Sequence, residues 1–231
     1  MRSLARVWIL VARMRQRLTG RPAPRAELVR RHAPGRTFAD IGCMWNVNGQ
    51  IAFLAEQSGA TSVTGLDIMP ATAEYEAEHA RRCSKVRFVE GDLHDPDVAS
   101  EVGEHDVVWC SGVLYHSPNP LLVLERLHAI TRELLILATE TIPEVPGLAQ
   151  ACVFFPGLPS ADRRVHSMAR PGSLALGVST PFERNQSYGA WWWGITPSAV
   201  RGMLRASGFE LVEEYGGRLH LTVIARPRAG G

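Results

Sequence analysis

The sequence predicts an α/β fold with a doubly wound, mostly parallel sheet. Three observations support this prediction. Apolar runs of strand length alternate with segments of helical periodicity between residues 36 and 140. The apolar runs are continuous, as expected for strands that are buried on both faces. Repeated strand–helix–strand units connect through right-handed crossovers, which place helices on both faces of one sheet.

Residues 1–35 are expected to form an N-terminal helical segment ahead of the main domain, residues 36–231. The apolar run Val7–Ala12 has six residues, is followed by arginines and lacks a small-residue cleavage site, so neither a signal peptide nor a transmembrane helix is expected. The segment is either a basic amphipathic helix at a membrane surface or a helix packed on the domain. The stretch GRPAPR, 20–25, breaks it, and a short helix is expected over 26–32.

Five strands and three longer helices are expected between residues 36 and 140. The strands are TFADIG, SVTGLDI, VRFVEGD, HDVVWCSG and ELLILATE, and the helices cover Gln50–Ser58, Ala71–Arg82 and Pro120–Thr131. Strands that alternate with helices in this way predict a parallel sheet.

After Glu140 the alternation stops. Residues 142–195 are rich in proline, glycine, serine and aromatic residues, and the segment is too long for a plain loop. Its apolar content argues against disorder, so a lid insertion after strand five is expected. Regular structure resumes with Thr196 as N-cap and Pro197 as the first helical residue. FELVEEYGG and LHLTVIARP are then expected to form an antiparallel hairpin that completes a seven-stranded sheet.

Composition narrows the function classes. The net charge of +2 is too small to indicate a nucleic-acid partner by itself. The four cysteines are scattered, without the spacing of a metal site, so no metal is expected. We therefore expect a protein of the reducing cytoplasm.

Acidic residues end three of the predicted strands, at Asp40, Asp67 and Asp92. Ligands of open α/β sheets bind beyond the carboxyl ends of the strands. Asp67 can accept both hydroxyls of a ribose, Asp92 an exocyclic amine, and Asp40 an ammonium or backbone amides. Each residue also has a simpler interpretation: Asp40 as a cap, Asp67 as a plain strand end and Asp92 as a turn residue.

The stretch ADIGCMWNVNGQIAFLA, residues 39–55, begins like a cofactor-binding loop. A dinucleotide site favours G-x-G-x-x-G, because the pyrophosphate needs closely approaching backbone amides. Here Gly42 is followed by another glycine only at Gly49. The spacing and the strand-end carboxylates favour a cofactor without phosphates over a nicotinamide dinucleotide.

Four segments in this order resemble the class I S-adenosylmethionine-dependent methyltransferases: ADIGC, VTGLDI, VRFVEGDLHD and HDVVWCSGVLYHSPNP. The resemblance covers residues 36–140 and the closing helix and hairpin at 196–227. It implies the Rossmann-like sheet of that family, which an antiparallel strand closes. The stretch SGVLYHSPNPLLVLERL is similar to the branch with tRNA wobble-uridine modifying enzymes and many small-molecule methyltransferases.

The resemblance implies S-adenosylmethionine as cofactor and a role for each matching residue. The methionine part would be lined by Asp40, Gly42, Cys43, Gly49 and Ser111; the ribose would bind Asp67; and the adenine would contact Ile68, Asp92 and Leu93. The family's loop reads D-x-G-x-G-x-G, and this sequence matches its first glycine, with Gly49 expected in place of the last. The insert MWN lies between them.

Catalytic and substrate residues are less marked in the sequence. His116 is a candidate general base, or a residue that shapes the pocket or caps the helix near Pro120. Tyr115 is a candidate neighbour of the methyl group. Glu140, His166 and Trp192 are candidate substrate contacts.

Methyl transfer to a small-molecule acceptor is the expected function, with a secondary-metabolite or a sugar- or lipid-linked intermediate as acceptor. A tRNA-modifying methyltransferase is the first alternative; arginines between residues 2 and 36 could hold phosphates. The second is a binding module that has lost the cofactor, which the altered glycine loop motivates. The sequence carries no signal for an oligomeric state.

Overall fold

A seven-stranded sheet organises the chain, in a computed structural model that describes residues 7, 11, 14, 23–167, 189–216 and 219–228, with the side chains of 165–167 outside the description. The strand order is β3-β2-β1-β4-β5-β9-β8. The strands are β1 (Thr37–Ile41), β2 (Ser62–Asp67), β3 (Arg87–Glu90), β4 (His105–Ser111), β5 (Thr131–Glu140), β8 (Phe209–Gly216) and β9 (His220–Pro227). Strands β1 to β5 run parallel, and β9 pairs antiparallel with β5 and β8. The predicted doubly wound sheet with a terminal hairpin is confirmed.

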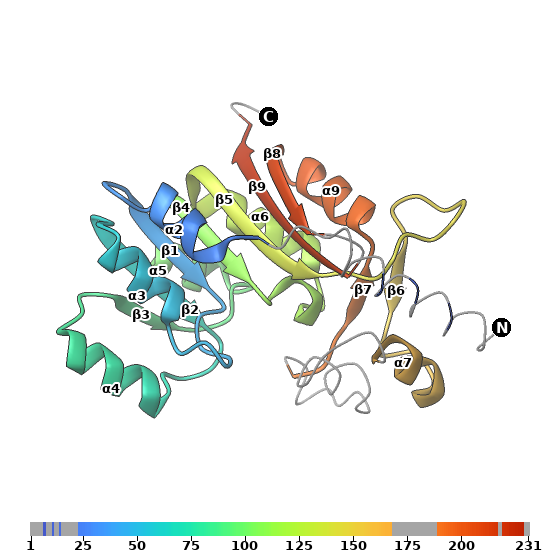
Figure 1. Ribbon diagram of the computed structural model, residues 1–231, viewed down its shortest axis with the longest axis horizontal. Helices are drawn as coiled ribbons and strands as arrows, with labels where there is room; N and C mark the ends of the chain where they lie inside the picture. Colours follow the sequence, from blue (N-terminus) through green and yellow to red (C-terminus); the bar gives the residue numbers. More distant parts are fainter. Residues whose placement is uncertain are drawn as a thin grey trace.

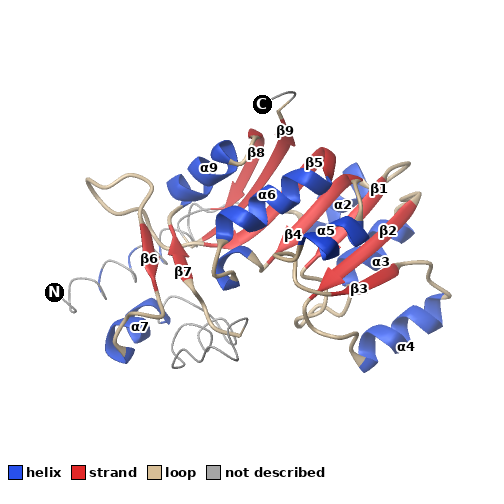
Figure 2. Cartoon of the chain, turned by 180° about the vertical axis from the view of Figure 1, so that it is seen from behind, coloured by secondary structure: helices blue, strands red, loops and turns tan. Residues whose placement is uncertain are grey.

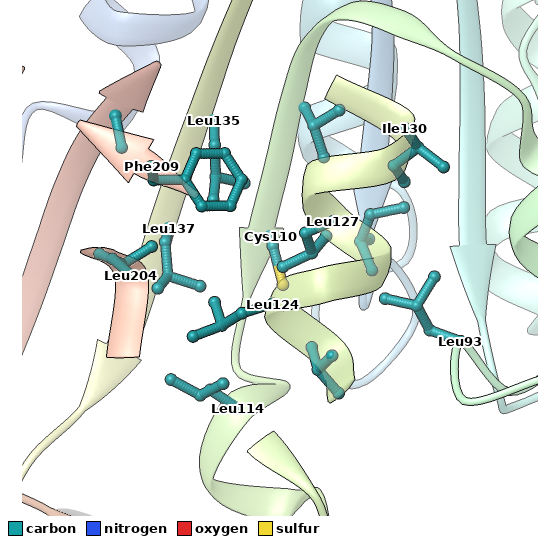
Figure 3. Packing of buried hydrophobic residues seen from close by; sticks show 14 of the residues in the cluster. Leu93, Cys110, Leu114, Leu124, Leu127, Ile130, Leu135, Leu137, Leu204 and Phe209 are labelled. Atoms are coloured by element: carbon teal, nitrogen blue, oxygen red, sulfur yellow. The ribbon is translucent and has the colours of Figure 1, made fainter. Parts of the chain in front are cut away.

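Helices cover both faces of the sheet (Figures 1 and 2). One face carries α2 (Arg25–His32), α3 (Gln50–Gln57) and α4 (Ala73–Arg82). The other carries α5 (Pro96–Val102), α6 (Pro120–Ile130) and α9 (Pro197–Ala206). Figure 3 shows this second layer, where Leu124 and Leu127 lie on the sheet side of α6 next to Cys110.

The two-residue period of β4 explains why its central residues, 107–110, form a continuous apolar run. Val107 and Trp109 pack on the first face, whereas Val108 and Cys110 pack on the second. All four side chains are fully buried. A strand in this position buries every residue, so no alternation is visible in its sequence.

The short helix α5 was not predicted. Its N-cap, Asp95, accepts a hydrogen bond from the Asp97 amide at 2.9 Å, and Pro96 occupies the first helical position. With seven residues and a mostly polar sequence, α5 shows too little periodicity to be recognised.

The segment after β5 folds beside the sheet. Its strands β6 (Cys152–Phe154) and β7 (Trp193–Ile195) pair antiparallel as a separate small sheet, which α7 (Ser160–Ser167) accompanies (Figure 1). Ile142, Phe155 and Trp191 pack with Tyr115, which lies in the 3-10 helix η1 (Leu114–His116) after β4. The described part of the insertion therefore contacts the carboxyl edge of the main sheet.

The start of α9 is as predicted. Thr196 is the N-cap, and its hydroxyl accepts a hydrogen bond from the Ala199 amide at 3.3 Å. The same hydroxyl donates to the Ala151 carbonyl at 2.9 Å, which ties the insertion to the main domain.

Most of the N-terminal segment lies outside the described residues. The choice between a membrane-surface helix and a packed helix therefore stays as the sequence leaves it. Among the residues that the structure does describe, none belongs to a helix with the length and apolar character needed to cross a membrane.

Candidate active site

A cavity of about 360 Å³ opens at the carboxyl edge of β1, β2, β3 and β4. Most of the predicted site residues line it: Asp40, Gly42, Asp67, Ile68, Asp92, Leu93, Ser111, Tyr115 and His116. They come from separate parts of the chain and meet because parallel strands end at one edge.

Two glycines shape the loop after β1. Gly42 has φ +82°, and a Cβ atom there would lie 2.6 Å from Val113 Cγ2 and 2.8 Å from the Ser111 carbonyl oxygen. Gly49 has φ +73°, and a Cβ would lie 2.6 Å from the Tyr75 ring. Both positions exclude a side chain, so the backbone passes close to its neighbours there.

The insert between these glycines is a closed turn. The Gly49 amide donates to the Cys43 carbonyl at 2.7 Å, and Asn46 and Asn48 adopt positive φ. Met44 is fully buried, whereas Trp45 lines the cavity with 56% of its surface exposed. The insert thus anchors itself with one side chain and places the next at the cavity rim. Cys43 is buried behind the loop, and neither it nor Gly49 lines the cavity.

Asp40 caps the start of α3 and also lines the cavity. Its Oδ2 accepts the Ala52 amide at 3.1 Å, which satisfies a donor in the first turn of α3, where the N-cap Gly49 has no side chain. Burial, with a smaller contribution from Asp67, raises the pKa of Asp40 to about 7, although the Ala52 amide and Arg25 act to lower it. A cationic ligand group in the cavity would favour the ionised carboxylate.

Asp67 joins the loop to β2. Its Oδ2 accepts the Met44 amide at 2.7 Å, and its Oδ1 accepts the Met69 amide at 2.9 Å. Burial raises the pKa of Asp67, while these amide hydrogen bonds act to lower it. An ionised carboxylate offers about four acceptor positions, so the side chain keeps capacity for ligand hydroxyls.

Part of the cavity wall is aromatic. The rings of Tyr115 and Trp191 lie 4.3 Å apart between centroids. His116 Nδ1 lies 2.9 Å from the Ala190 carbonyl oxygen, so Nδ1 carries the hydrogen and Nε2 keeps its lone pair. Burial lowers the pKa of His116 to about 4, which keeps the ring neutral at pH 7.

The remaining predicted substrate residues do not line this cavity. Glu140 Oε1 lies 3.3 Å from His220 Nδ1, between β5 and β9. Trp192 lies beside Phe154, with ring centroids 6.4 Å apart, so Trp191 is the tryptophan that lines the cavity. The side chain of His166 is outside the described residues.

The lining residues that were not recognised in the sequence as parts of the site include Arg25, His94, Ser117 and Trp191. His94 follows Asp92 by two residues, and this short spacing in the sequence could have indicated that His94 lies near the site. Arg25 lies at the start of α2, ahead of β1 in the sequence, and only the fold brings it to the cavity. It is a cationic residue in a cavity that three carboxylates also line.

The cavity wall carries two kinds of group. Three carboxylates line it, and so do the rings of Tyr115, His116 and Trp191. Among the described residues, no group of histidine, cysteine, aspartate or glutamate side chains could hold a metal ion. The cavity suits a polar, hydroxyl-bearing ligand beside a neutral, flat one.

Comparison with known sequences agrees with this geometry. Residues 39–135 match the sequence model of the family described as Methyltransferase domain. The ubiquinone biosynthesis O-methyltransferase of Vibrio parahaemolyticus serotype O3:K6 (strain RIMD 2210633) is 32% identical over 99 residues. This match spans 42% of this chain and 40% of the relative, so the chain covers less than half of that protein's length.

Solved structures share the fold. The N-terminal domain of EvdMO1 with SAH bound superposes with a TM-score of 0.60 at 16% identity, over 91% of this chain and 83% of that chain. The Burkholderia thailandensis 1,6-didemethyltoxoflavin-N1-methyltransferase, with bound 1,6-didemethyltoxoflavin and S-adenosylhomocysteine, has a TM-score of 0.59 at 17% identity, over 89% and 77%. Residues 39–135 thus match a methyltransferase domain in sequence, and the chain shares its fold with these solved structures.

Proposed function

We propose that the protein transfers a methyl group from S-adenosylmethionine to a neutral small-molecule acceptor, an intermediate of secondary-metabolite, sugar or lipid biosynthesis. The carrying observation is one cavity lined both by the carboxylates of Asp40, Asp67 and Asp92 and by the contacting rings of Tyr115, His116 and Trp191. A cofactor and an acceptor can lie side by side against these two groups.

The carboxylates of the cavity wall and the residues next to them fit the cofactor. Gly42 lines the cavity without a side chain, which lets a ligand approach the backbone. Asp40 suits the methionine ammonium, Arg25 its carboxylate and Asp67 the ribose hydroxyls. Asp92 and Ile68 suit the amine and the face of adenine. When bound, the cofactor supplies an electrophilic methyl group on its sulfonium.

The contacting rings of Tyr115, His116 and Trp191 fit a flat acceptor that carries a hydroxyl. The Nε2 lone pair of the neutral His116 accepts the hydroxyl's hydrogen bond and aligns the oxygen with the methyl carbon. The bound cofactor would supply the methyl group to this oxygen, and the hydroxyl proton would pass to water. His116, which burial keeps neutral, would orient the hydroxyl through Nε2. Tyr115 and Trp191 enclose the acceptor ring.

The named relatives are in line with such an acceptor. One is an O-methyltransferase of ubiquinone biosynthesis, and the other is an N1-methyltransferase crystallised with 1,6-didemethyltoxoflavin. The first favours oxygen as the acceptor atom.

An acceptor panel tests the proposal. The protein is incubated with S-adenosylmethionine and, separately, phenols, catechols, sugar nucleotides, hydroxylated lipids and bulk tRNA, and S-adenosylhomocysteine release is followed. We expect release above background with a phenolic acceptor, and at least tenfold less with His116→Ala. Release with tRNA alone would contradict the small-molecule assignment.

The tRNA alternative has less support from the described surface. Arg31 pairs with Glu213, and Arg36 pairs with Glu133 at 3.0 Å, so both cations are partly neutralised. The arginines before residue 22 lie outside the described residues. A gel shift of tRNA that weakens with added salt would favour this alternative.

A further inference from the structure

Three polar side chains form a hydrogen-bonded chain along the cavity wall. His94 Nδ1 lies 2.6 Å from Asp92 Oδ1, and His94 Nε2 lies 2.8 Å from Ser117 Oγ. All three residues line the cavity, and the chain connects the end of β3 with the loop after η1. The proposed function uses only Asp92.

The positions of the hydrogens follow from the partners. Ser117 Oγ accepts the Asn119 amide at 3.0 Å, so its own hydrogen can be donated to His94 Nε2. A neutral His94 with its hydrogen on Nδ1 then donates to Asp92 and accepts from Ser117. Every donor in the chain meets an acceptor, and the ring is held at both nitrogens.

His94 also determines how the Asp92 carboxylate is turned. The His94 backbone amide donates to Asp92 Oδ1 at 2.9 Å, and the ring contacts the same oxygen. Two hydrogen bonds from one residue therefore orient the carboxylate. A preset orientation lowers the entropic cost of recognising a ligand.

We propose that His94 is a positioning residue for adenine recognition, holding the Asp92 carboxylate where it accepts the 6-amino group of the cofactor. This inference rests on the proposed function, because it requires the cofactor or its product in this cavity. Ser117 anchors the other side of the ring.

The order Asp–His–Ser also occurs in hydrolases, where it activates the serine. Here Ser117 has 2% of its surface exposed, and its Oγ is engaged by the Asn119 amide. These contacts suit an anchor and not a nucleophile.

Calorimetry with two ligands tests the role. S-adenosylhomocysteine carries the 6-amino donor, whereas S-inosylhomocysteine carries a 6-oxo acceptor that faces the carboxylate unfavourably. For the wild type we expect the inosyl ligand to bind at least tenfold more weakly. His94→Phe should bring this ratio close to one, and His94→Asn, whose amide can still donate to Asp92, should restore part of it.

The control is His79→Phe, the same change at a histidine whose Nε2 contacts the Val86 carbonyl outside the cavity. It should leave the ratio at its wild-type value. An unchanged ratio in His94→Phe, even with both ligands bound more weakly, would overturn the proposal. Two other variants replace His94→Phe if it does not fold. The proposal would then be overturned if the ratio of the two affinities equals the wild-type ratio in Ser117→Ala and is not lower than the wild-type ratio in His94→Asn. Failure of the wild type to bind S-adenosylhomocysteine would instead contradict the proposed function.

Discussion

Asp67 holds the glycine loop in place as well as facing the cavity. Its carboxylate accepts the Met44 and Met69 amides, so truncation to alanine would remove two buried acceptors and also disturb the loop. Asparagine keeps one acceptor oxygen and removes the charge. It therefore separates ligand recognition from loop stability better than alanine does.

For Asp67→Asn we expect the affinity for S-adenosylhomocysteine to fall at least tenfold, because ribose hydroxyls lose a charged acceptor worth about 1.5–3 kcal/mol. The melting temperature should fall by a few degrees. Calorimetry and thermal unfolding measure the two effects. Wild-type affinity in this variant would exclude Asp67 as the ribose ligand.

The raised pKa of Asp40 leads us to expect that cofactor binding depends on pH. Its folded-state pKa, about 7, lies above the ordinary value of 3.8, so the free protein holds a proton there that the unfolded chain releases. Its ionisation therefore lowers stability as pH rises from about 4 to 7. A ligand ammonium favours the ionised form, so binding expels the proton and affinity should rise with pH over pH 5.5–8.

Titrations of S-adenosylhomocysteine at several pH values check this expectation. Asp40→Asn is the matched control, since its amide oxygen can still accept the Ala52 amide. This variant should lose most of the pH dependence. A wild-type slope that persists in the variant would assign the proton to another group.

The sequence could identify the three strand-end carboxylates, because long apolar strands mark their own ends. It could not identify Arg25 or Trp191, whose place in the cavity depends on how α2 and the insertion pack against the sheet. The sequence predicted Trp192 as a substrate contact, whereas Trp191 is the residue that lines the cavity, and this difference shows the limit. Adjacent residues of an extended segment point in opposite directions, and only the packing shows which one faces the cavity.

At the scale of elements, the turn between β1 and α3 replaces closely spaced glycines with a hydrogen-bonded insert. Gly49 begins α3 in a left-handed conformation, directly against Tyr75. The long helices and strands follow from periodicity, whereas this turn, α5 and the β6–β7 pair do not. Short elements are specified by caps and tertiary contacts more than by pattern.

Gly49→Ala should destabilise the protein by about 2 kcal/mol or more, from the left-handed backbone and the overlap with the Tyr75 ring. Gly59→Ala is the matched control: Gly59 has φ +90°, but nothing lies within 4 Å of the position that an alanine Cβ would take. That variant should lose only about 1 kcal/mol. Urea unfolding compares the two, and equal losses would show that the contact with Tyr75 is unimportant.

At the scale of the whole molecule, the insertion after β5 completes the cavity. Trp191 reaches it from the insertion and packs against Tyr115 of the main domain. Under the proposed function, the cofactor would contact residues at the strand ends, and the acceptor would contact residues where the sheet meets the insertion. Changes in the insertion would then alter substrate choice without altering the cofactor contacts.

Trp191→Phe should raise the KM for the best acceptor of the panel several-fold and leave the affinity for S-adenosylhomocysteine within about twofold, because a smaller ring encloses the acceptor less well. Trp192→Phe, which changes a neighbouring ring outside the cavity, should alter neither value. Equal effects of the two variants on KM would place the acceptor elsewhere.

The proposed function and the role of His94 both require that the cavity at the carboxyl edge of β1 to β4 binds the cofactor. Titration calorimetry of the purified wild-type chain with S-adenosylhomocysteine measures this binding. We predict one site per chain and a rise in melting temperature with ligand concentration. Absence of both binding heat and a thermal shift at millimolar ligand would contradict it.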